Sequence, residues 1–351
     1  MTFPLAIQGL GIAAGFGCGN EAALQAIENG SGPNESMQVQ TQDGPFDYPV
    51  YTADPAPLKE FISPKKLRRV NKYSKIATLA AYLALQDAGF DTPQHHSNMA
   101  VIVASGYGAS TTTFKFLDDV IQEGDEFASP TQFSNSVHSS AASHITILLQ
   151  IQGPCLTVTQ FKMSPVAALL NAQTWLREKR VDAVLLGGVD EINPVLLYCY
   201  QNLWKTQIPK AIEPLNFQKQ TAIPGEGAAF MLLTRAEGRS PQYGYINNVS
   251  WENTSEFKIP KDDTAVIGAD GHRVCGHGYT KILQRTDKYN IKTFSTITGS
   301  MPSGQMFDIA LASLASRNRL LLDRFCSIKA NLNQDLGVIC VSSHPEFSRN
   351  P

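Results

Sequence analysis

The side chains that could perform nucleophilic or metal chemistry are few in this sequence and stand far apart. The six cysteines occupy positions 18, 155, 199, 275, 326 and 340, with no CxxC pair and no cluster with histidine that matches a metal site. Several lie in apolar stretches, where cysteine packs as a small hydrophobic side chain. We therefore expect free thiols, no metal ion and no cofactor.

A lysine occupies an unusual position for a charged side chain. The sequence predicts a strand that begins at Gly153 and ends at Val158, and an Ala- and Leu-rich helix from Ser164 to Arg177. Lys162 stands where that helix begins, and both the helix dipole and burial disfavour a cation there. The nearest thiol, Cys155, lies within the strand, and we interpret it as a packed side chain rather than a nucleophile.

Apolar strands and helices alternate along most of the chain. This pattern predicts α/β layers with a mostly parallel sheet covered on both faces. Residues 31–63 and 238–263 are polar and poorly patterned, so we expect an irregular surface segment and a bridge between two halves. The expected strands are 5–12, 99–105, 153–158, 181–188, 224–233, 264–268 and 337–341, and the clearest helices are 72–88, 164–177 and 306–322.

Composition narrows the class of protein. A chain of 351 residues is long enough for two packed halves, and its net charge is −2 with basic residues spread apart. Only the run at residues 65–69 is basic, and we interpret it as a solvated helix start, which argues against nucleic acid as a partner. No apolar run approaches the length of a membrane span, so we expect no membrane insertion. Free thiols and the lack of a signal peptide favour the cytoplasm.

Five strings of residues resemble the β-ketoacyl synthase family. They are the opening segment Leu5–Ala22 with its Gly-Leu-Gly and Phe-Gly-Cys-Gly, the segment 129–144, Gly153-Pro154, the segment 182–191, and Gly225–Ala229. The resemblance is specific over residues 1–235 and weak afterwards. It implies a thiolase-like fold of two similar halves in five layers, α-β-α-β-α, with an N-terminal half at 1–235 and a shortened C-terminal half at 236–351.

The same resemblance implies that the residues of catalysis have been replaced. Active relatives condense acyl units with one cysteine at the helix start and two histidines from the second half. Counting from Gly153-Pro154 places Lys162 at the cysteine, and similar matching places Asp270 and Ser300 at the histidines. The family's glycine-rich loop near the C-terminus is replaced by residues 341–347. His272 and His277 stand near Asp270, but a loop histidine outside the motif is more often solvated than catalytic.

The exchange of Cys and His for Lys162 and Asp270 suggests a buried ion pair that fills the former site. Such a pair loses several kcal/mol to desolvation, roughly, and needs close geometry with further hydrogen bonds. The alternative is that Lys162 extends outward to solvent. A nitrogen-to-carboxylate distance beyond hydrogen-bond range excludes the pair.

The resemblance further implies a function without catalysis at these positions. The chain looks like a chain-length factor of a type II polyketide or aryl polyene system, in which an inactive homologue forms a heterodimer with an active ketosynthase and works with an acyl carrier protein. Phe133, Asn135 and His138 are candidates for contacts with the partner's pocket, or for ordinary interface packing. The alternatives are an active 3-oxoacyl-acyl-carrier-protein synthase of fatty-acid-like biosynthesis that uses Lys162 as an amine nucleophile, and a malonyl decarboxylase.

Overall fold

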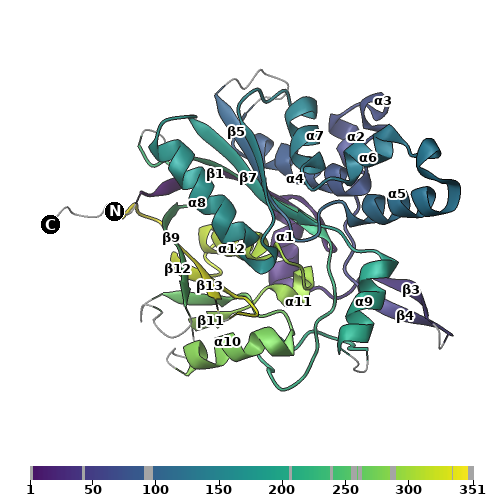
Figure 1. The fold of residues 1–351 in the computed structure, drawn as a ribbon. Helices are drawn as coiled ribbons and strands as arrows, with labels where there is room; N and C mark the ends of the chain where they lie inside the picture. The colour runs from purple at the N-terminus through teal and green to yellow at the C-terminus, as the bar shows by residue number, and fades with distance from the viewer. Residues whose placement is uncertain are drawn as a thin grey trace.

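The computed structural model describes residues 3–41, 44–90, 98–204, 208–237, 240–253, 259, 263–284, 290–333 and 335–346. Its main feature is one long mixed sheet (Figure 1), in the order β11-β10-β12-β13-β9-β1-β8-β7-β5-β6. The expectation of a mostly parallel sheet is wrong, because the sheet is mixed. Parallel pairs occur at the two ends, and antiparallel pairs occupy the middle.

The sheet consists of two sets of five strands with the same internal order. Numbering the strands of each set in chain order, both sets run 1-5-4-2-3, with antiparallel, antiparallel, parallel and parallel pairings in turn. The sets are joined where β1 pairs with β9, Leu5 opposite Ile246. The first set is β1 (Leu5–Ala14), β5 (Met99–Ala104), β6 (Cys155–Val158), β7 (Ala183–Asp190) and β8 (Gly227–Arg235); the second is β9 (Tyr245–Asn253), β10 (Thr264–Ile267), β11 (Ile291–Lys292), β12 (Arg324–Ala330) and β13 (Asp335–Ser342).

Helices cover both faces of each set and produce five layers. The helices α8 (Ser164–Arg177) and α12 (Gly304–Arg317) lie between the two sets of strands, because each contacts strands of both. The helices α4 (Lys72–Asp87) and α7 (Ser140–Leu148) cover the outer face of the first set, and α10 (Arg273–Leu283) covers that of the second. The predicted thiolase-like arrangement of layers is therefore confirmed. The predicted boundary at residue 235 coincides with the end of β8 and stays a prediction.

The apolar stripe predicted for residues 72–88 packs on β1 through small residues. A Cβ atom at Gly9 would lie 2.4 Å from the carbonyl oxygen of Ala84, and one at Gly11 only 2.0 Å from that of Ala80. Glycine in the strand and alanine in the helix therefore let the two backbones approach more closely than larger side chains allow. This contact fixes the outer layer of the first half.

Two segments expected to be irregular contain strands. The strands β3 (Glu35–Thr41) and β4 (Gly44–Val50) pair antiparallel in a separate small sheet, which packs Val39, Tyr48 and Val50 against α9 (Pro194–Trp204). The expected bridge at 238–263 includes β9, the strand that joins the two halves. The remaining helices include α1 (Gly19–Asn29), α2 (Leu58–Phe61), α3 (Pro64–Leu67), α5 (Ser110–Glu123), α6 (Pro130–Ser136) and α11 (Ser295–Thr298), with the short strand β2 (Gly17–Cys18) beside β1.

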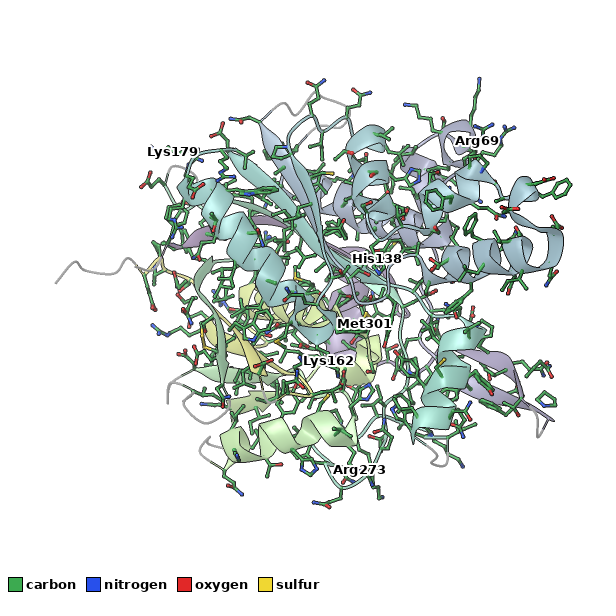
Figure 2. The ribbon with its side chains drawn as sticks, viewed as in Figure 1. Arg69, His138, Lys162, Lys179, Arg273 and Met301 are labelled. Carbon is green, nitrogen blue, oxygen red and sulfur yellow. A yellow bond between two sulfur atoms is a disulfide. The ribbon has the colours of Figure 1, made fainter. Side chains whose placement is uncertain are left out.

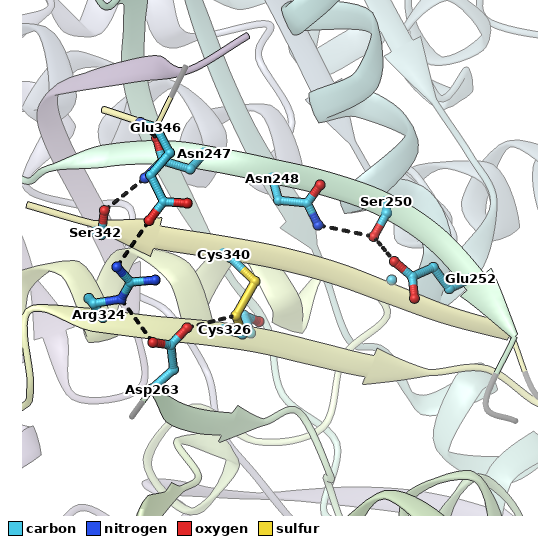
Figure 3. Close-up of a disulfide and its surroundings, with 12 residues drawn as sticks. Asn247, Asn248, Ser250, Glu252, Asp263, Arg324, Cys326, Cys340, Ser342 and Glu346 are labelled. Carbon is cyan, nitrogen blue, oxygen red and sulfur yellow. Dashed lines mark hydrogen bonds and ion pairs between the residues drawn. A yellow bond between two sulfur atoms is a disulfide. The ribbon is translucent and has the colours of Figure 1, made fainter. Parts of the chain in front are cut away.

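The expectation of free thiols throughout is also wrong. Cys326 on β12 and Cys340 on β13 are direct cross-strand neighbours and form a disulfide (Figure 3). Cys155 lies on β6 as expected, but it is exposed rather than packed. In the part of the chain that the structure describes, no helix has the length and apolar character needed to cross a membrane.

Candidate functional site

Lys162 lies in the sharp connection from β6 to α8. This connection contains a single 3₁₀ turn, Phe161–Met163, and Phe161 has a φ of 47°, a left-handed conformation that is unfavourable for a bulky side chain. Ser164 stabilises the turn, since its hydroxyl accepts from the backbone nitrogen of Gln160 at 2.7 Å and donates to the carbonyl of Ser105 at 2.9 Å. The turn directs Lys162 toward the second half, beside Met301 (Figure 2).

Asp270 meets Lys162 from the other half of the molecule. It follows β10 at the carboxyl end of the parallel strands, the usual place for functional groups in such sheets. The Nζ atom of Lys162 lies 2.7 Å from Oδ2 and 3.0 Å from Oδ1 of Asp270, and the two side chains are 13% and 3% exposed. The predicted ion pair is confirmed, and the alternative of an outward-pointing Lys162 is wrong.

Two more groups bind the same carboxylate. Lys329 on β12, 2% exposed, donates to Oδ2 of Asp270 at 3.1 Å and to the carbonyl of Gly268 at 2.7 Å. Ser300 donates its hydroxyl to Oδ2 at 3.0 Å, so the three residues that the resemblance places at the catalytic positions lie together. Sequence reasoning missed Lys329, although a lysine within the otherwise apolar end of β12 was a signal of a buried charge.

The opposite charges in this cluster stabilise the ionised forms of Asp270 and Lys162. Burial opposes ionisation of Asp270, but the ammonium groups of Lys162 and Lys329 hold its pKa well below the usual value. Burial likewise opposes the charge of Lys162, yet the Asp270 carboxylate raises the pKa of that lysine. Nearby, burial raises the pKa of Asp308 to about 7, against the attraction of Lys329. An amine nucleophile at Lys162 would need a lowered pKa, so this geometry opposes that chemistry.

A pocket of about 470 Å³ opens beside the ion pair. The pair therefore does not fill the former site, contrary to the expectation. His272 and Cys275, at the start of α10, line the pocket with Lys162. Burial and the Lys162 ammonium lower the pKa of His272 to about 3, so its imidazole is neutral. His277 is exposed on α10 and is not part of the lining.

Backbone contacts between the halves hold the site together. The buried Asp190 accepts from the backbone nitrogens of Gly106 at 2.8 Å and Ser303 at 2.7 Å. Ser300 donates its backbone nitrogen to Ile223 at 2.8 Å, and the preceding Gly299 has a φ of 80°, which favours glycine. Ser300 is thus held by its backbone as well as by the bond of its hydroxyl to Asp270.

The three interface candidates lie in different environments on and after α6. Phe133 is 58% exposed, with its ring 5.6 Å from that of Phe116, and His138 is exposed beside Gly108. Asn135 is buried: its amide donates to the carbonyl of Arg69 at 2.9 Å and its oxygen contacts His144 at 2.7 Å. The side chain of Asn135 is thus engaged within the chain.

Residues 341–345, in the segment that was expected to replace the family's glycine-rich loop, and Lys162 line different pockets. Ser342, His344 and Glu346 contact Asn247 and Arg324 at the edge of β9 and β12 (Figure 3), and residues 341–345 line a separate pocket of about 400 Å³. Residue 347 lies outside the described residues. In the described part of the chain, no three His, Cys, Asp or Glu side chains are placed to hold a metal ion.

The sequence profile described as "Beta-ketoacyl synthase, N-terminal domain" matches residues 6–238. The chain belongs to the β-ketoacyl synthase family. The tetracenomycin polyketide synthase ketoacyl synthase alpha subunit of Streptomyces glaucescens is 22% identical over 246 residues, which is 65% of this chain and 56% of that protein. Nodulation protein E of Rhizobium leguminosarum bv. trifolii is 27% identical over 234 residues, 65% and 57% respectively. The chain spans somewhat more than half the length of the curated relatives it matches.

Solved β-ketoacyl synthase structures resemble the whole chain, including the second half beyond the profile. A structure titled "The ishigamide ketosynthase/chain length factor" has a TM-score of 0.73 at 16% identity, covering 97% of this chain and 99% of that one. A β-ketoacyl synthase from Burkholderia phymatum has a TM-score of 0.74 at 15% identity, covering 97% and 100%. These likenesses show that the thiolase-like ketosynthase fold extends through β13.

Proposed function

We propose that this chain is a catalytically inactive ketosynthase homologue, a chain-length factor that forms a heterodimer with an active ketosynthase. The single observation that carries the proposal is the ion pair between Lys162 and Asp270. These residues occupy the positions that the family resemblance assigns to the nucleophilic cysteine and a catalytic histidine, and they bind each other at 2.7 Å.

The chemistry of the cluster supports the loss of condensation at this site. An acyl thioester requires a thiol, whereas Lys162 is held as an ammonium whose electron pair carries a proton. Asp270 is an anion held by two lysines, and an anion repels the negative charge of an enolate that a neutral imidazole would stabilise. Ser300 is engaged with the same carboxylate.

One surface of the chain supports pairing with a second ketosynthase-like chain. The strand β6 is the last strand at its edge of the described sheet, and an unpaired edge is a template for another strand. Beside it α7 exposes Ile147 at 70%, and α6 exposes Phe133 at 58%. Apolar side chains at such exposure favour burial against a partner.

A basic surface supports the proposed acyl carrier protein as the third component. Lys65, Lys66, Arg68 and Arg69 are all exposed on and after α3, with Arg69 at the upper edge of the view in Figure 2. Four neighbouring cations attract and orient an acidic protein through long-range electrostatics. A solved relative of this fold is titled as a type II polyketide acyl-carrier protein in complex with its ketosynthase. We extend the proposal to polyketide, aryl polyene or fatty-acid-like chains as products.

Co-expression tests the proposal. The chain is produced with a ketosynthase from the same genome that retains cysteine and both histidines, and with the corresponding carrier protein. We expect a stable heterodimer, and chain elongation from malonyl units only when both subunits are present. Ile147→Glu is expected to abolish co-purification, whereas Leu320→Glu, an exposed position near β10, leaves it intact. A chain that purifies alone as a homodimer and condenses malonyl units unaided would refute the proposal.

One observation favours a second candidate, an enzyme with altered catalytic residues. The neutral imidazole of His272 and the thiol of Cys275 both line the pocket with Lys162. Neutral imidazole can stabilise the charge that develops in decarboxylation of a malonyl group. Release of carbon dioxide from malonyl-acyl carrier protein by the isolated chain, lost in His272→Ala, would favour this malonyl decarboxylase.

A further inference from the structure

The pocket beside Lys162 is lined in part by side chains that carry hydrogen-bond donors. Two N–H groups of Lys162 are used by the two oxygens of Asp270, which leaves a third on an ammonium that lines the pocket. Gln220 also lines it. Its Oε1 atom accepts from the backbone nitrogen of Arg273, but its buried Nε2 atom has no hydrogen-bond partner. A buried donor without a partner is costly, and a ligand with acceptor oxygens would satisfy it.

The charge around these side chains is positive. Lys162 and Lys329 carry two positive charges against the single negative charge of Asp270. The N-terminus of α10 also faces the pocket, since Arg273, Val274 and Cys275 at its first turn all belong to the lining. The helix dipole adds partial positive charge there. Burial raises the pKa of Asp308 to about 7, so this carboxyl group is only partly ionised near neutral pH. Its negative charge therefore offsets only part of the net positive charge of Lys162, Lys329 and Asp270.

One wall of the pocket is aromatic. The ring of Tyr107 lies 5.5 Å from that of Phe161 and 6.4 Å from that of Tyr200, and Tyr200 stacks on Trp204 at 4.8 Å. The rim is apolar as well, because Leu203 and other large side chains of the lining are exposed there. Aromatic walls of this kind favour flat, unsaturated ligands.

We propose that this pocket binds a flat aromatic or conjugated carboxylic acid as a free, non-covalent ligand. The carboxylate accepts hydrogen bonds from Lys162 and Gln220, and the unsaturated body lies along the wall of Tyr107, Tyr200 and Trp204. The pocket volume of about 470 Å³ is in the usual range for small-molecule sites. The inference concerns this chain alone and does not depend on a partner synthase.

Binding of trans-cinnamate to the full-length protein tests the proposal. Isothermal titration should give a Kd below about 1 mM, and trans-cinnamamide, which has the same shape without the charge, should bind about tenfold more weakly. Lys162→Met should weaken cinnamate binding by a similar factor, whereas the exposed Lys59→Met should not change it. Equal binding of acid and amide, measured on the unaltered protein, would overturn the proposal whether or not any variant folds.

A thiol gives an independent readout of the binding position. Cys275 lines the pocket, and Cys155 is exposed on β6 at an edge of the sheet. Cys275 is only 3% exposed, so iodoacetamide should alkylate it slowly in the free protein and more slowly still with bound cinnamate, while alkylation of the exposed Cys155 stays unchanged, as followed by peptide mass spectrometry. Unchanged alkylation of Cys275 at saturating cinnamate would place the ligand elsewhere and refute the assignment. Octanoate should bind more weakly than cinnamate, and equal binding would refute the aromatic preference.

Discussion

Replacing Asp270 by asparagine should destabilise the protein more than replacing either lysine partner. Asp270→Asn keeps the shape of the side chain but removes the carboxylate that Lys162 and Lys329 both contact, at 13% and 2% exposure. An uncompensated buried charge costs about 3–5 kcal/mol. Lys162→Met leaves Asp270 paired with Lys329 and bound by Ser300, so it should cost only about 1.5 kcal/mol. The exposed Lys59→Met serves as a control and should stay within about 0.5 kcal/mol.

Urea unfolding at pH 7.5, followed by circular dichroism, measures these differences as changes in the free energy of unfolding. The double variant Lys162→Met with Asp270→Asn should cost clearly less than the sum of the two single changes, because Asp270→Asn strands the Lys162 ammonium and Lys162→Met removes that ammonium. Equal losses for Asp270→Asn and Lys59→Met would refute the reasoning, since an exposed side chain such as Lys59 contributes almost nothing to stability. Strict additivity in the double variant would refute the direct coupling.

Three further outcomes follow from the structure. Burial raises the pKa of Asp308 and of Glu191 to about 7, above their unfolded values near 4, so each contributes a fall in the free energy of unfolding as pH rises through about 4 to 7. The pKa of His272, lowered to about 3, contributes an opposing rise below its unfolded value near 6.5, so the test compares two proteins. In thermal melts at stepped pH, the stability of Asp308→Asn relative to the unaltered protein should rise from about pH 4 to about pH 7. Reduction of the Cys326–Cys340 disulfide should lower the free energy of unfolding by about 3 kcal/mol, measured with and without dithiothreitol, and Cys326→Ala should be insensitive to the reductant. Lys162→Cys alone should leave malonyl condensation at background, because both histidine positions are also replaced; restored turnover would contradict this.

Much of the fold could be predicted because its strands are continuously buried. The ten residues of β1 and the eight of β7 are all buried, and such strands give uniform apolar runs. The small sheet of β3 and β4 was missed because only alternate residues face α9, and prolines and glycines interrupt the pattern. The strand β9 was missed because its pattern is irregular: the polar Asn247 is buried and the apolar Trp251 is exposed. Its partner strands, β1 near the N-terminus and β13 near the C-terminus, are both distant from β9 in the sequence, so no local pattern indicates the pairing.

The sequence was enough to predict two residues of the site, but not the third charged residue or the pocket beside them. The resemblance located Lys162 and Asp270, and opposite charges at two converging positions were enough to predict the pair. Lys329 could not be assigned to the cluster, because its place depends on the pairing of β12 beside β10, between residues about sixty positions apart in the chain. The open pocket could not be predicted either. Its volume depends on the packing of α9 and α10, which no single string of residues specifies.

The repeated strand order has a consequence for how this protein could lose an activity and keep its architecture. Lys162 follows the third strand of the first set, and Ser300 follows the third strand of the second, so the two positions are counterparts under an internal duplication. Lys162 lies in a turn in which the Ser164 hydroxyl accepts from the backbone nitrogen of Gln160, and Ser300 donates its own backbone nitrogen to the carbonyl of Ile223. Side chains at these counterparts can therefore drift without loosening the frame. If the proposed loss of chemistry is right, the chain keeps the backbone frame of an active ketosynthase, which is the shape that a partner subunit of the same fold presents to its neighbour.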